Sequence, residues 1–222
     1  MPQSTHYAAP RVLWLAETLK PRSVLDVGCG SGKYGVLLRF VLEQILPPQE
    51  RSQLQIDGLD VFNPEMSVWH KLYNRMHIGD VRTLASKLDI YDLIYLGDII
   101  EHFEKTEGYS VVRSLLPKAR MGVIITTPYH FFEQGAIDGN EFERHRSLWK
   151  KRDFGAFRHA RCWVEYRRKL VALVSNAPLP NLSGERFVRS WLSSSLEHLV
   201  FSLCSFSTAR YLKRIITGVQ AK

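Results

Sequence analysis

The sequence predicts an α/β fold: a doubly wound, mostly parallel sheet of seven strands with a C-terminal helical extension. Short apolar runs alternate with segments of helical apolar spacing from residue 24 to residue 126. The first run leads through three glycines into a helix, and the run at 91–98 is apolar enough for a central parallel strand buried on both faces. After a Pro/Asn/Ser/Gly linker at 176–184, two amphipathic stripes predict the extension.

The individual elements follow from this periodicity in chain order. An amphipathic helix over 8–19 ends before Pro21. Two apolar runs near the end, 157–167 and 169–175, have the alternation of an antiparallel pair at a sheet edge. The other strands are expected at 24–27, 54–59, 76–78, 91–98 and 122–126, and the other helices at 34–46, 66–73, 81–88 and 108–116, with a polar connector at 49–53.

The glycine-rich segment 28–32 is typical of a nucleotide-type site. Glycines let the backbone approach a ligand, and the helix that follows presents free N–H groups to an anion. A Walker A loop is excluded, because Val27 stands where its first glycine belongs and Tyr34 follows Lys33 in place of Ser or Thr. A dinucleotide fingerprint is disfavoured, because Lys33 takes the place of its third glycine and the acid expected about 20 residues further on is absent.

The remaining pattern, Asp-x-Gly-x-Gly-x-Gly over 26–32, resembles motif I of the class I S-adenosylmethionine-dependent methyltransferases. The resemblance covers about residues 1–175 and implies their Rossmann-like fold, with the loop holding the methionine half of S-adenosyl-L-methionine. Asp60, at the end of the second strand, suits the ribose hydroxyls, and Asp80 matches the position that meets adenine; a turn cap and a helix N-cap are the structural alternatives. The expected cofactor-binding residues are Asp26, which orients the loop, and Gly28, Cys29, Gly30, Gly32, Asp60, Val61, Asp80, Val81 and Gly97.

The segment 98–102 resembles the Asp-x-x-Glu-His signature of methyltransferases that act on small molecules, such as those of ubiquinone biosynthesis. Methyl transfer by in-line displacement needs near-attack geometry and, for a hydroxyl or ammonium acceptor, a base. We expect Asp98, His102 and His145 to be catalytic, with His130 as a further base candidate and a small molecule as the acceptor. Packing at a helix start, for His102, and a loop or cap contact, for His145, are the structural alternatives.

An alternative function joins these side chains in a metal site. Small-RNA 3′-terminal 2′-O-methyltransferases are similar here, since they use a Glu-x-x-Glu-His segment and a later histidine to bind a metal that grips the terminal hydroxyls. This chain offers Glu101, His102 and His145, together with Asp98 or His130, but it has Asp98 where that family has its first Glu. We therefore expect no metal in the principal function.

Charge is distributed unevenly along the chain. Residues 139–222 contain 16 Lys and Arg against 6 Asp and Glu, whereas residues 1–138 contain 14 against 16. The basic third could face RNA, a phosphorylated metabolite or a membrane surface, or it could be a solvated face. We expect a methyltransferase domain at 1–175 and a linker with a basic helical extension at 176–222, whose segment 185–222 packs on the domain, forms a homodimer or contacts a membrane surface.

The cysteine content and the absence of long apolar segments indicate the expected cellular location. Three cysteines without close pairing give neither a disulfide framework nor a zinc knuckle, which favours a reducing, cytoplasmic location. No signal peptide or transmembrane segment is expected. A non-catalytic module that binds S-adenosylmethionine, or a scaffold recruited through 185–222, stays open as a function of another class, although the acids after strands two, three and four favour an enzyme.

Overall fold

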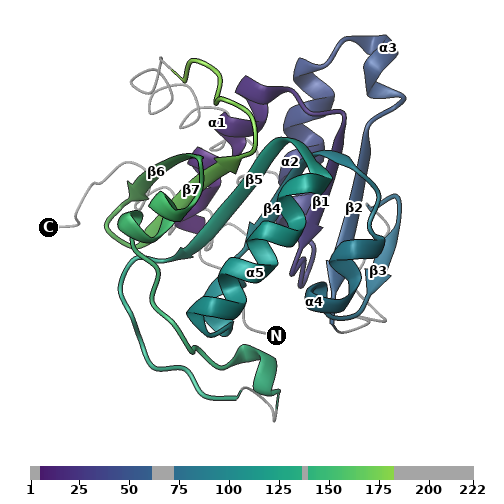
Figure 1. Cartoon of the computed structure of the whole chain (residues 1–222). Helices are drawn as coiled ribbons and strands as arrows, with labels where there is room; N and C mark the ends of the chain where they lie inside the picture. The colour runs from purple at the N-terminus through teal and green to yellow at the C-terminus, as the bar shows by residue number, and fades with distance from the viewer. Residues whose placement is uncertain (1–5, 62–72, 137–139, 183–222) are drawn as a thin grey trace, which may run out of the picture. The chain divides into compact units, whose positions relative to one another are not determined.

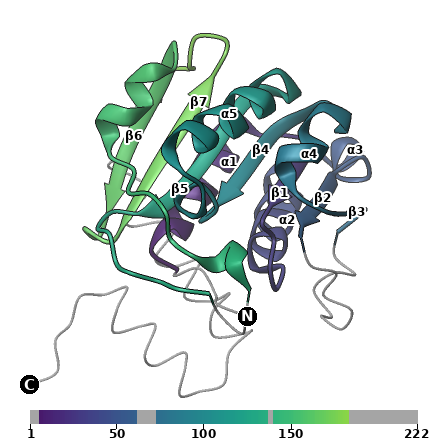
Figure 2. The ribbon, with the colours of Figure 1, turned by 60° about the horizontal axis from the view of Figure 1, so that its bottom comes forward.

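The computed structural model describes residues 6–61, 73–136 and 140–182. A seven-stranded sheet with the order β3-β2-β1-β4-β5-β7-β6 forms its centre (Figure 1). Helices cover both faces of this sheet (Figures 1 and 2). The predicted fold class, a doubly wound and mostly parallel α/β sheet, is confirmed for these residues.

Five short parallel strands make up most of the sheet. β4 (Tyr91–Gly97) lies between β1 (Ser23–Val27) and β5 (Ala119–Pro128), and all of its residues are buried. β2 (Gln55–Asp60) and β3 (Met76–Ile78) continue the sheet on the other side of β1. Because parallel strands end at the same edge, the segments that follow β1, β2 and β4 come together there.

The last two strands form the expected antiparallel pair. β6 (His159–Glu165) and β7 (Lys169–Ser175) are joined by a tight turn in which Tyr166 and Arg167 have φ of 51° and 55°. β7 inserts next to β5, antiparallel to it, with Lys169 opposite Pro128. The start of β7 therefore lies at the same edge of the sheet as the ends of the parallel strands.

The helices lie in two layers. α1 (Ala9–Leu19) and α2 (Lys33–Ile45) pack together behind the sheet in Figure 1, and α4 (Val81–Leu84) and α5 (Lys105–Leu115) lie in front of it. Short 3₁₀ helices complete the described structure: His6–Ala8, Ala85–Lys87, Ile100–His102, Leu116–Lys118, Glu141–Glu143 and Lys151–Ala156.

Some boundaries differ from the sequence predictions. The segment 49–53 is predicted as a polar connector, and the short helix α3 (Pro48–Arg51) forms there because proline suits the first helical position, where its missing N–H is not needed. The helix expected at 81–88 is α-helical only to Leu84 and continues as a 3₁₀ helix. α5 begins three residues before the expected start, and β5 extends beyond the expected run on both sides.

Aromatic side chains fill the core in front of the sheet. Trp149 is fully buried, contacts the rings of Tyr109 and Phe154, and donates from Nε1 to the carbonyl of Ile100 at 3.0 Å. Trp163, on β6, is also buried. Both tryptophans are therefore core residues.

Other predictions fall outside the described residues. The helix at 66–73 lies almost wholly there, and so do the amphipathic stripes of the C-terminal extension and the homodimer or membrane role of 185–222. Two compact units divide the chain, Met1–Pro180 and Asn181–Lys222. No helix among the described residues is long and apolar enough to span a membrane.

Candidate active site

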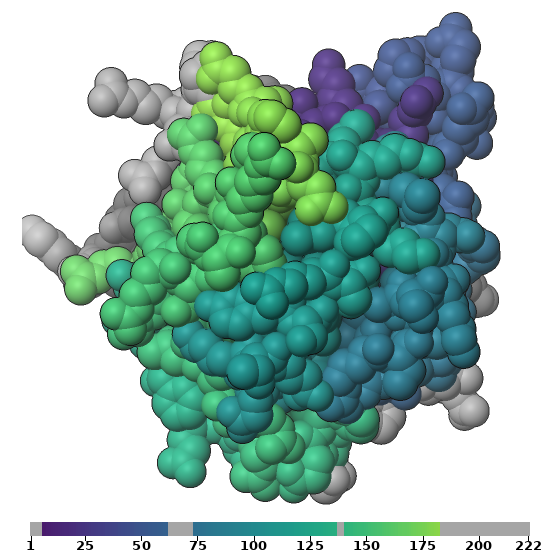
Figure 3. Space-filling view, viewed as in Figure 1, coloured from purple at the N-terminus to yellow at the C-terminus, as the bar shows by residue number. Residues whose placement is uncertain are grey.

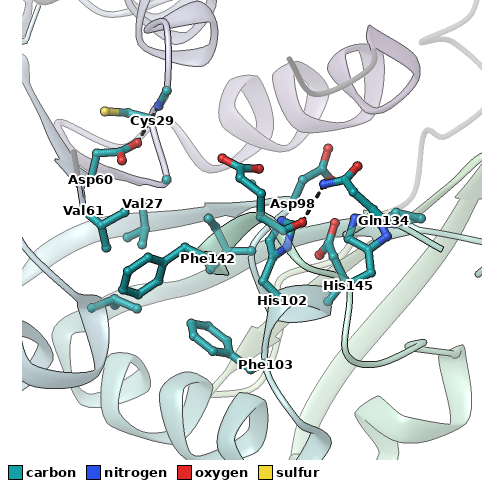
Figure 4. A pocket seen from close by; sticks show the side chains of 18 of the residues that line it. Val27, Cys29, Asp60, Val61, Asp98, His102, Phe103, Gln134, Phe142 and His145 are labelled. Atoms are coloured by element: carbon teal, nitrogen blue, oxygen red, sulfur yellow. Dashed lines mark hydrogen bonds between the residues drawn. The ribbon is translucent and has the colours of Figure 1, made fainter. Parts of the chain in front are cut away.

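A cavity of about 760 Å³ opens where β1, β2, β4 and β5 end. Figure 4 shows Cys29, Asp60 and Val61 toward one end of this cavity and His102 and His145 toward the other. Among the predicted site residues, only Gly32 does not line it. The residues that do are Asp26, Gly28, Cys29, Gly30, Asp60, Val61, Asp80, Val81, Gly97, Asp98, His102 and His145.

Glycine occupies each of its three positions in the loop for a different structural reason. Gly28 has φ of 70°, which disfavours any other residue, and a Cβ there would lie 2.1 Å from Cδ1 of Ile99, so a larger residue would also force that side chain to move. A Cβ at Gly30, with φ of 50°, would meet nothing within 4 Å, so the backbone here borders open cavity. Gly32 caps the start of α2 with φ of 85°. The loop thus leaves space for a ligand along Gly30.

Asp60 ties the end of β2 to the glycine loop. Its Oδ2 accepts a hydrogen bond from the backbone N–H of Gly30 at 2.9 Å. The carbonyl of Leu59 accepts from the N–H groups of Gly28 and Cys29 at 2.8 and 3.3 Å. The carboxylate therefore lies against the glycine loop and faces the cavity, where it can also accept from a ligand hydroxyl.

Asp26 is buried beneath the loop. Its Oδ2 accepts from the hydroxyl of Tyr73 at 2.5 Å, and its carboxylate also accepts from the backbone N–H of Gly35 in α2. Burial raises its pKa to about 7, against the effect of these hydrogen bonds. Asp26 links β1, α2 and Tyr73, which suits the predicted role of orienting the loop.

Asp80 caps α4, as the structural alternative predicted. Its Oδ1 accepts from the backbone N–H of Arg82 at 2.8 Å, and its Oδ2 accepts from Nε of Arg82 at 2.7 Å and pairs with Nη2. Burial raises the pKa of Asp80, but the bonds from Arg82 outweigh it and leave the pKa below its usual range. The carboxylate also borders the cavity, so capping does not exclude contact with a ligand.

Asp98 follows β4 directly and lies toward the end of the cavity that contains His102 and His145. It has φ of 55°, which is uncommon for a residue other than glycine. Its Oδ1 accepts from Oγ1 of Thr126 at 3.0 Å, and its Oδ2 forms an ion pair with Nζ of Lys169 at 2.6 Å. Lys169, the first residue of β7, is buried and lines the cavity, and no sequence pattern predicts this position.

Two histidines lie together beside Asp98 (Figure 4). The rings of His102 and His145 are 5.0 Å apart between centroids. Nδ1 of His102 lies 3.2 Å from the carbonyl of Arg144, and Nδ1 of His145 lies 3.0 Å from that of Phe132. Because a carbonyl only accepts, each Nδ1 carries the proton and each Nε2 keeps a lone pair. Burial lowers the pKa of both rings, so both are neutral at pH 7.

Glu101 completes this cluster. Only 2% of the residue is exposed, and its Oε2 has no hydrogen-bond partner. Burial and the nearby charge of Asp98 raise its pKa to about 8. The ligand atoms of Glu101, His102 and His145 all lie within 4.8 Å of one another, whereas His130 lines the cavity without belonging to this group.

The cluster is held by the segment that follows β5. Its backbone N–H groups at Arg146 and Ser147 donate to the carbonyl of Glu101 at 2.8 and 3.0 Å. Trp149 and Arg144 contact the same turn through the bonds to Ile100 and His102 described above. In the space-filling view this segment, in green, lies at the surface below α5 (Figure 3). It also brings Phe131 and Phe142, each about half exposed, to the rim of the cavity.

Known proteins resemble this chain in structure only. No protein-family model matches it, and no curated protein matches its sequence. Among solved structures, the plantazolicin methyltransferase BpumL, in complex with a triazolic desmethylPZN analog and SAH, is 15% identical, with 79% of this chain and 87% of that chain covered and a TM-score of 0.54.

Two further structures share the fold. A putative O-methyltransferase from Nostoc punctiforme is 13% identical, with 75% of this chain and 55% of that chain covered and a TM-score of 0.52, so the match spans about half of that protein. The methyltransferase domain of bacterial CtHen1-C is 18% identical, with 78% and 99% covered and a TM-score of 0.50. At these identities the likeness establishes the fold, which is the Rossmann-like fold of class I methyltransferases.

Proposed function

We propose that this chain is an S-adenosylmethionine-dependent methyltransferase that acts on a small-molecule acceptor. The observation that carries the proposal is the bond between the Asp60 carboxylate and the N–H of Gly30, which joins the acid after β2 to the glycine loop inside one cavity. The similarity to solved structures described as methyltransferases supports it, because they share the fold in which this loop and this acid occur.

The residues present fit S-adenosylmethionine. The open space at Gly30 would admit its methionine half along the loop, and Asp60 would accept from its ribose hydroxyls. Val61 and Val81 offer apolar contact for the adenine ring of the cofactor, and Asp80 also lines this part of the cavity. We assign these residues, with Asp26 as the support of the loop, to the cofactor half of the cavity.

The other half of the cavity suits an acceptor. When bound, S-adenosylmethionine supplies a methyl group on a sulfonium, which an acceptor atom attacks in line. The neutral Nε2 atoms of His102 and His145 can take a proton from a hydroxyl or ammonium placed between them. Asp98, paired with Lys169, can orient the acceptor, while Phe131 and Phe142 provide an apolar rim.

Calorimetric titration with S-adenosylhomocysteine tests the proposal. We expect micromolar binding to the wild-type chain and a loss of at least tenfold in Asp60→Ala, because the mutant removes the acceptor of the ribose hydroxyls. Asp89→Ala is the matched control, since Asp89 is exposed and pairs with Arg75 away from the cavity. No binding to the wild type would refute the proposal, and binding without methyl transfer to any acceptor would favour a non-catalytic module.

The cluster of Glu101, His102 and His145 favours a second candidate, a metal-dependent RNA 3′-terminal 2′-O-methyltransferase. Two imidazoles with Nδ1 held by carbonyls and a buried carboxylate form a ligand set for a divalent cation. The solved CtHen1-C methyltransferase domain shares the fold. The ion pair between Lys169 and Asp98 counts against it, because it occupies the carboxylate that would otherwise be a further ligand.

A metal titration separates the two candidates. If the RNA candidate is correct, Mn²⁺ binds the wild type, fails to bind His102→Ala and His145→Ala, and supports methyl transfer to a short RNA in a reaction that EDTA abolishes. His77→Ala is the control, because His77 lies on β3 and does not line the cavity. Binding of S-adenosylhomocysteine that is indifferent to Mn²⁺ and EDTA would instead support the small-molecule function.

A further inference from the structure

A buried tyrosine lies behind the glycine loop without lining the cavity. Tyr73 comes shortly before β3, and only 7% of it is exposed. Its hydroxyl donates to Oδ2 of Asp26, the fourth residue of β1, at 2.5 Å. Asp26 is 1% exposed and borders the cavity, whereas Tyr73 does not. Tyr73 can therefore act on a bound ligand only through the residues that it holds.

Tyr73 is fixed from two sides. Its ring packs against α2 at Gly35, where a Cβ would lie 2.4 Å from Cζ of the tyrosine. The next residue, Asn74, is bonded to β2: its backbone N–H donates to the carbonyl of Ile56 at 2.7 Å, and its Oδ1 accepts from the N–H of Ile56 at 2.9 Å. The ring and the neighbouring backbone are thus both held, so the hydroxyl has little freedom to leave Asp26.

The same hydroxyl reaches into the glycine loop. It hydrogen-bonds with the thiol of Cys29, which lines the cavity at the same end as Asp60 (Figure 4). Burial raises the pKa of this thiol, and the charges of Asp26 and Asp60 raise it further, so the thiol stays neutral although the bond with Tyr73 opposes them. One side chain therefore joins the carboxyl that precedes the loop to a side chain within the loop.

The carboxyl of Asp26 depends on this arrangement. A buried polar group is costly unless it is hydrogen-bonded, and the hydroxyl of Tyr73 and the backbone N–H of Gly35 bond this one. Without the hydroxyl, the carboxyl would be drawn toward water in the cavity, and the loop begins only two residues further on. We propose that Tyr73 is a positioning residue that holds the glycine loop in its ligand-binding form through Asp26 and Cys29. The inference rests on the proposed function.

Calorimetric titration with S-adenosylhomocysteine tests this role. Tyr73→Phe keeps the ring and removes the hydroxyl, and we expect it to weaken binding about 5- to 30-fold, the usual effect of losing one hydrogen bond to a buried carboxyl. Tyr91→Phe is the matched control, because the buried Tyr91 donates in the same way to the buried Asp57 at 2.7 Å and neither residue lines the cavity. The control should keep its affinity within twofold.

A double-mutant cycle in binding separates positioning from general packing. If Tyr73 acts through Asp26, then Tyr73→Phe should weaken S-adenosylhomocysteine less than threefold in an Asp26→Ala background, where the acceptor of its hydrogen bond is gone. Factors that multiply independently in the double variant would overturn the inference. Equal weakening in Tyr73→Phe and Tyr91→Phe would also overturn it, because both variants remove a buried hydroxyl.

Amide hydrogen exchange supplies a second measurement that needs no ligand. The N–H groups of Gly28 and Gly30 are bonded to Leu59 and Asp60, so their exchange reports opening of the loop. Relative to the amides of β4, both should exchange at least fivefold faster in Tyr73→Phe than in the wild type or in Tyr91→Phe. Measured at 10 °C, this readout also serves a variant too unstable for calorimetry.

The two measurements distinguish failure of the inference from failure of the proposed function. An unchanged exchange ratio at Gly28 and Gly30 in Tyr73→Phe would overturn the role of Tyr73 while the wild type still binds S-adenosylhomocysteine. Failure of the wild type to bind S-adenosylhomocysteine would overturn the proposed function, and with it the assignment of the loop to a cofactor.

Discussion

Replacing Lys169 with methionine should lower the free energy of unfolding by about 3 kcal/mol, because it leaves the Asp98 carboxylate buried without its cation. The Nζ–Oδ2 distance is 2.6 Å, and the two side chains are only 7% and 13% exposed, so water replaces the lost partner only in part. Breaking a buried pair commonly costs about 3–5 kcal/mol, and the lower value applies because Thr126 still donates to Asp98. For a chain of this size we expect a fall in Tm of about 6–12 °C.

Urea denaturation followed by tryptophan fluorescence measures the loss, and a double-mutant cycle identifies its source. Asp98→Asn should also destabilise the chain, but the double variant should lose less than the sum of the single losses, by about 2 kcal/mol. Arg120→Met is the matched control: Arg120 pairs with Asp92 at 3.0 Å but is 60% exposed, so its loss should stay within about 1 kcal/mol. Additive losses in the cycle would show that the two residues do not act as a pair.

Three further predictions concern the loop, its support and the turn after β4. Gly28→Ala should lower the free energy of unfolding by more than about 2 kcal/mol, whereas Gly30→Ala should lower it by about 1 kcal/mol because of its positive φ. The main effect of Gly30→Ala should be weaker binding of S-adenosylhomocysteine. Denaturation measures the first effect and calorimetry the second, and equal destabilisation by the two variants would contradict the geometry. The pKa of Asp26 is about 7 in the folded chain, so as the pH rises the unfolded chain loses the Asp26 proton first, and the free energy of unfolding falls between about pH 4 and 7. In urea titrations at several pH values, Asp26→Asn should reduce the slope of this fall by up to about 1.4 kcal/mol per pH unit. An unchanged slope would exclude Asp26 as its source. Trp149→Phe should cost about 1–2 kcal/mol by leaving the carbonyl of Ile100 without its indole donor, and it should weaken binding at the histidine cluster more than at the glycine loop.

The fold and the cofactor half of the cavity could be predicted because their signals are local. Gly28, Gly30 and Asp60 each follow an apolar run, and the edge at which parallel strands end brings such residues together without further information. The same rule placed Asp98 and His102 after β4. The roles of these residues in binding and catalysis stay predictions until the titrations above are made.

The ion pair of the acceptor half could not be predicted in the same way. Lys169 reaches Asp98 only because β7 inserts antiparallel next to β5, so that the beginning of β7 meets the ends of its neighbours. No sequence pattern near Lys169 or near Asp98 predicts this contact. In the sequence, Lys33 stands out only because it takes the place of the third glycine of a dinucleotide fingerprint; its relation to Asp98 depends on how the loop turns in space.

The segment after β5 makes the acceptor half a separable part of the molecule. It holds the turn after β4 through main-chain bonds to Glu101 and supplies His145 and Phe142, whereas the bond from Gly30 to Asp60 joins the glycine loop to the end of β2. Changes in its length or composition could therefore alter which molecules enter without disturbing the cofactor half. Exchange of this single stretch of chain would change which acceptors the scaffold binds, provided that the hydrogen bonds from Arg146 and Ser147 to Glu101 are retained.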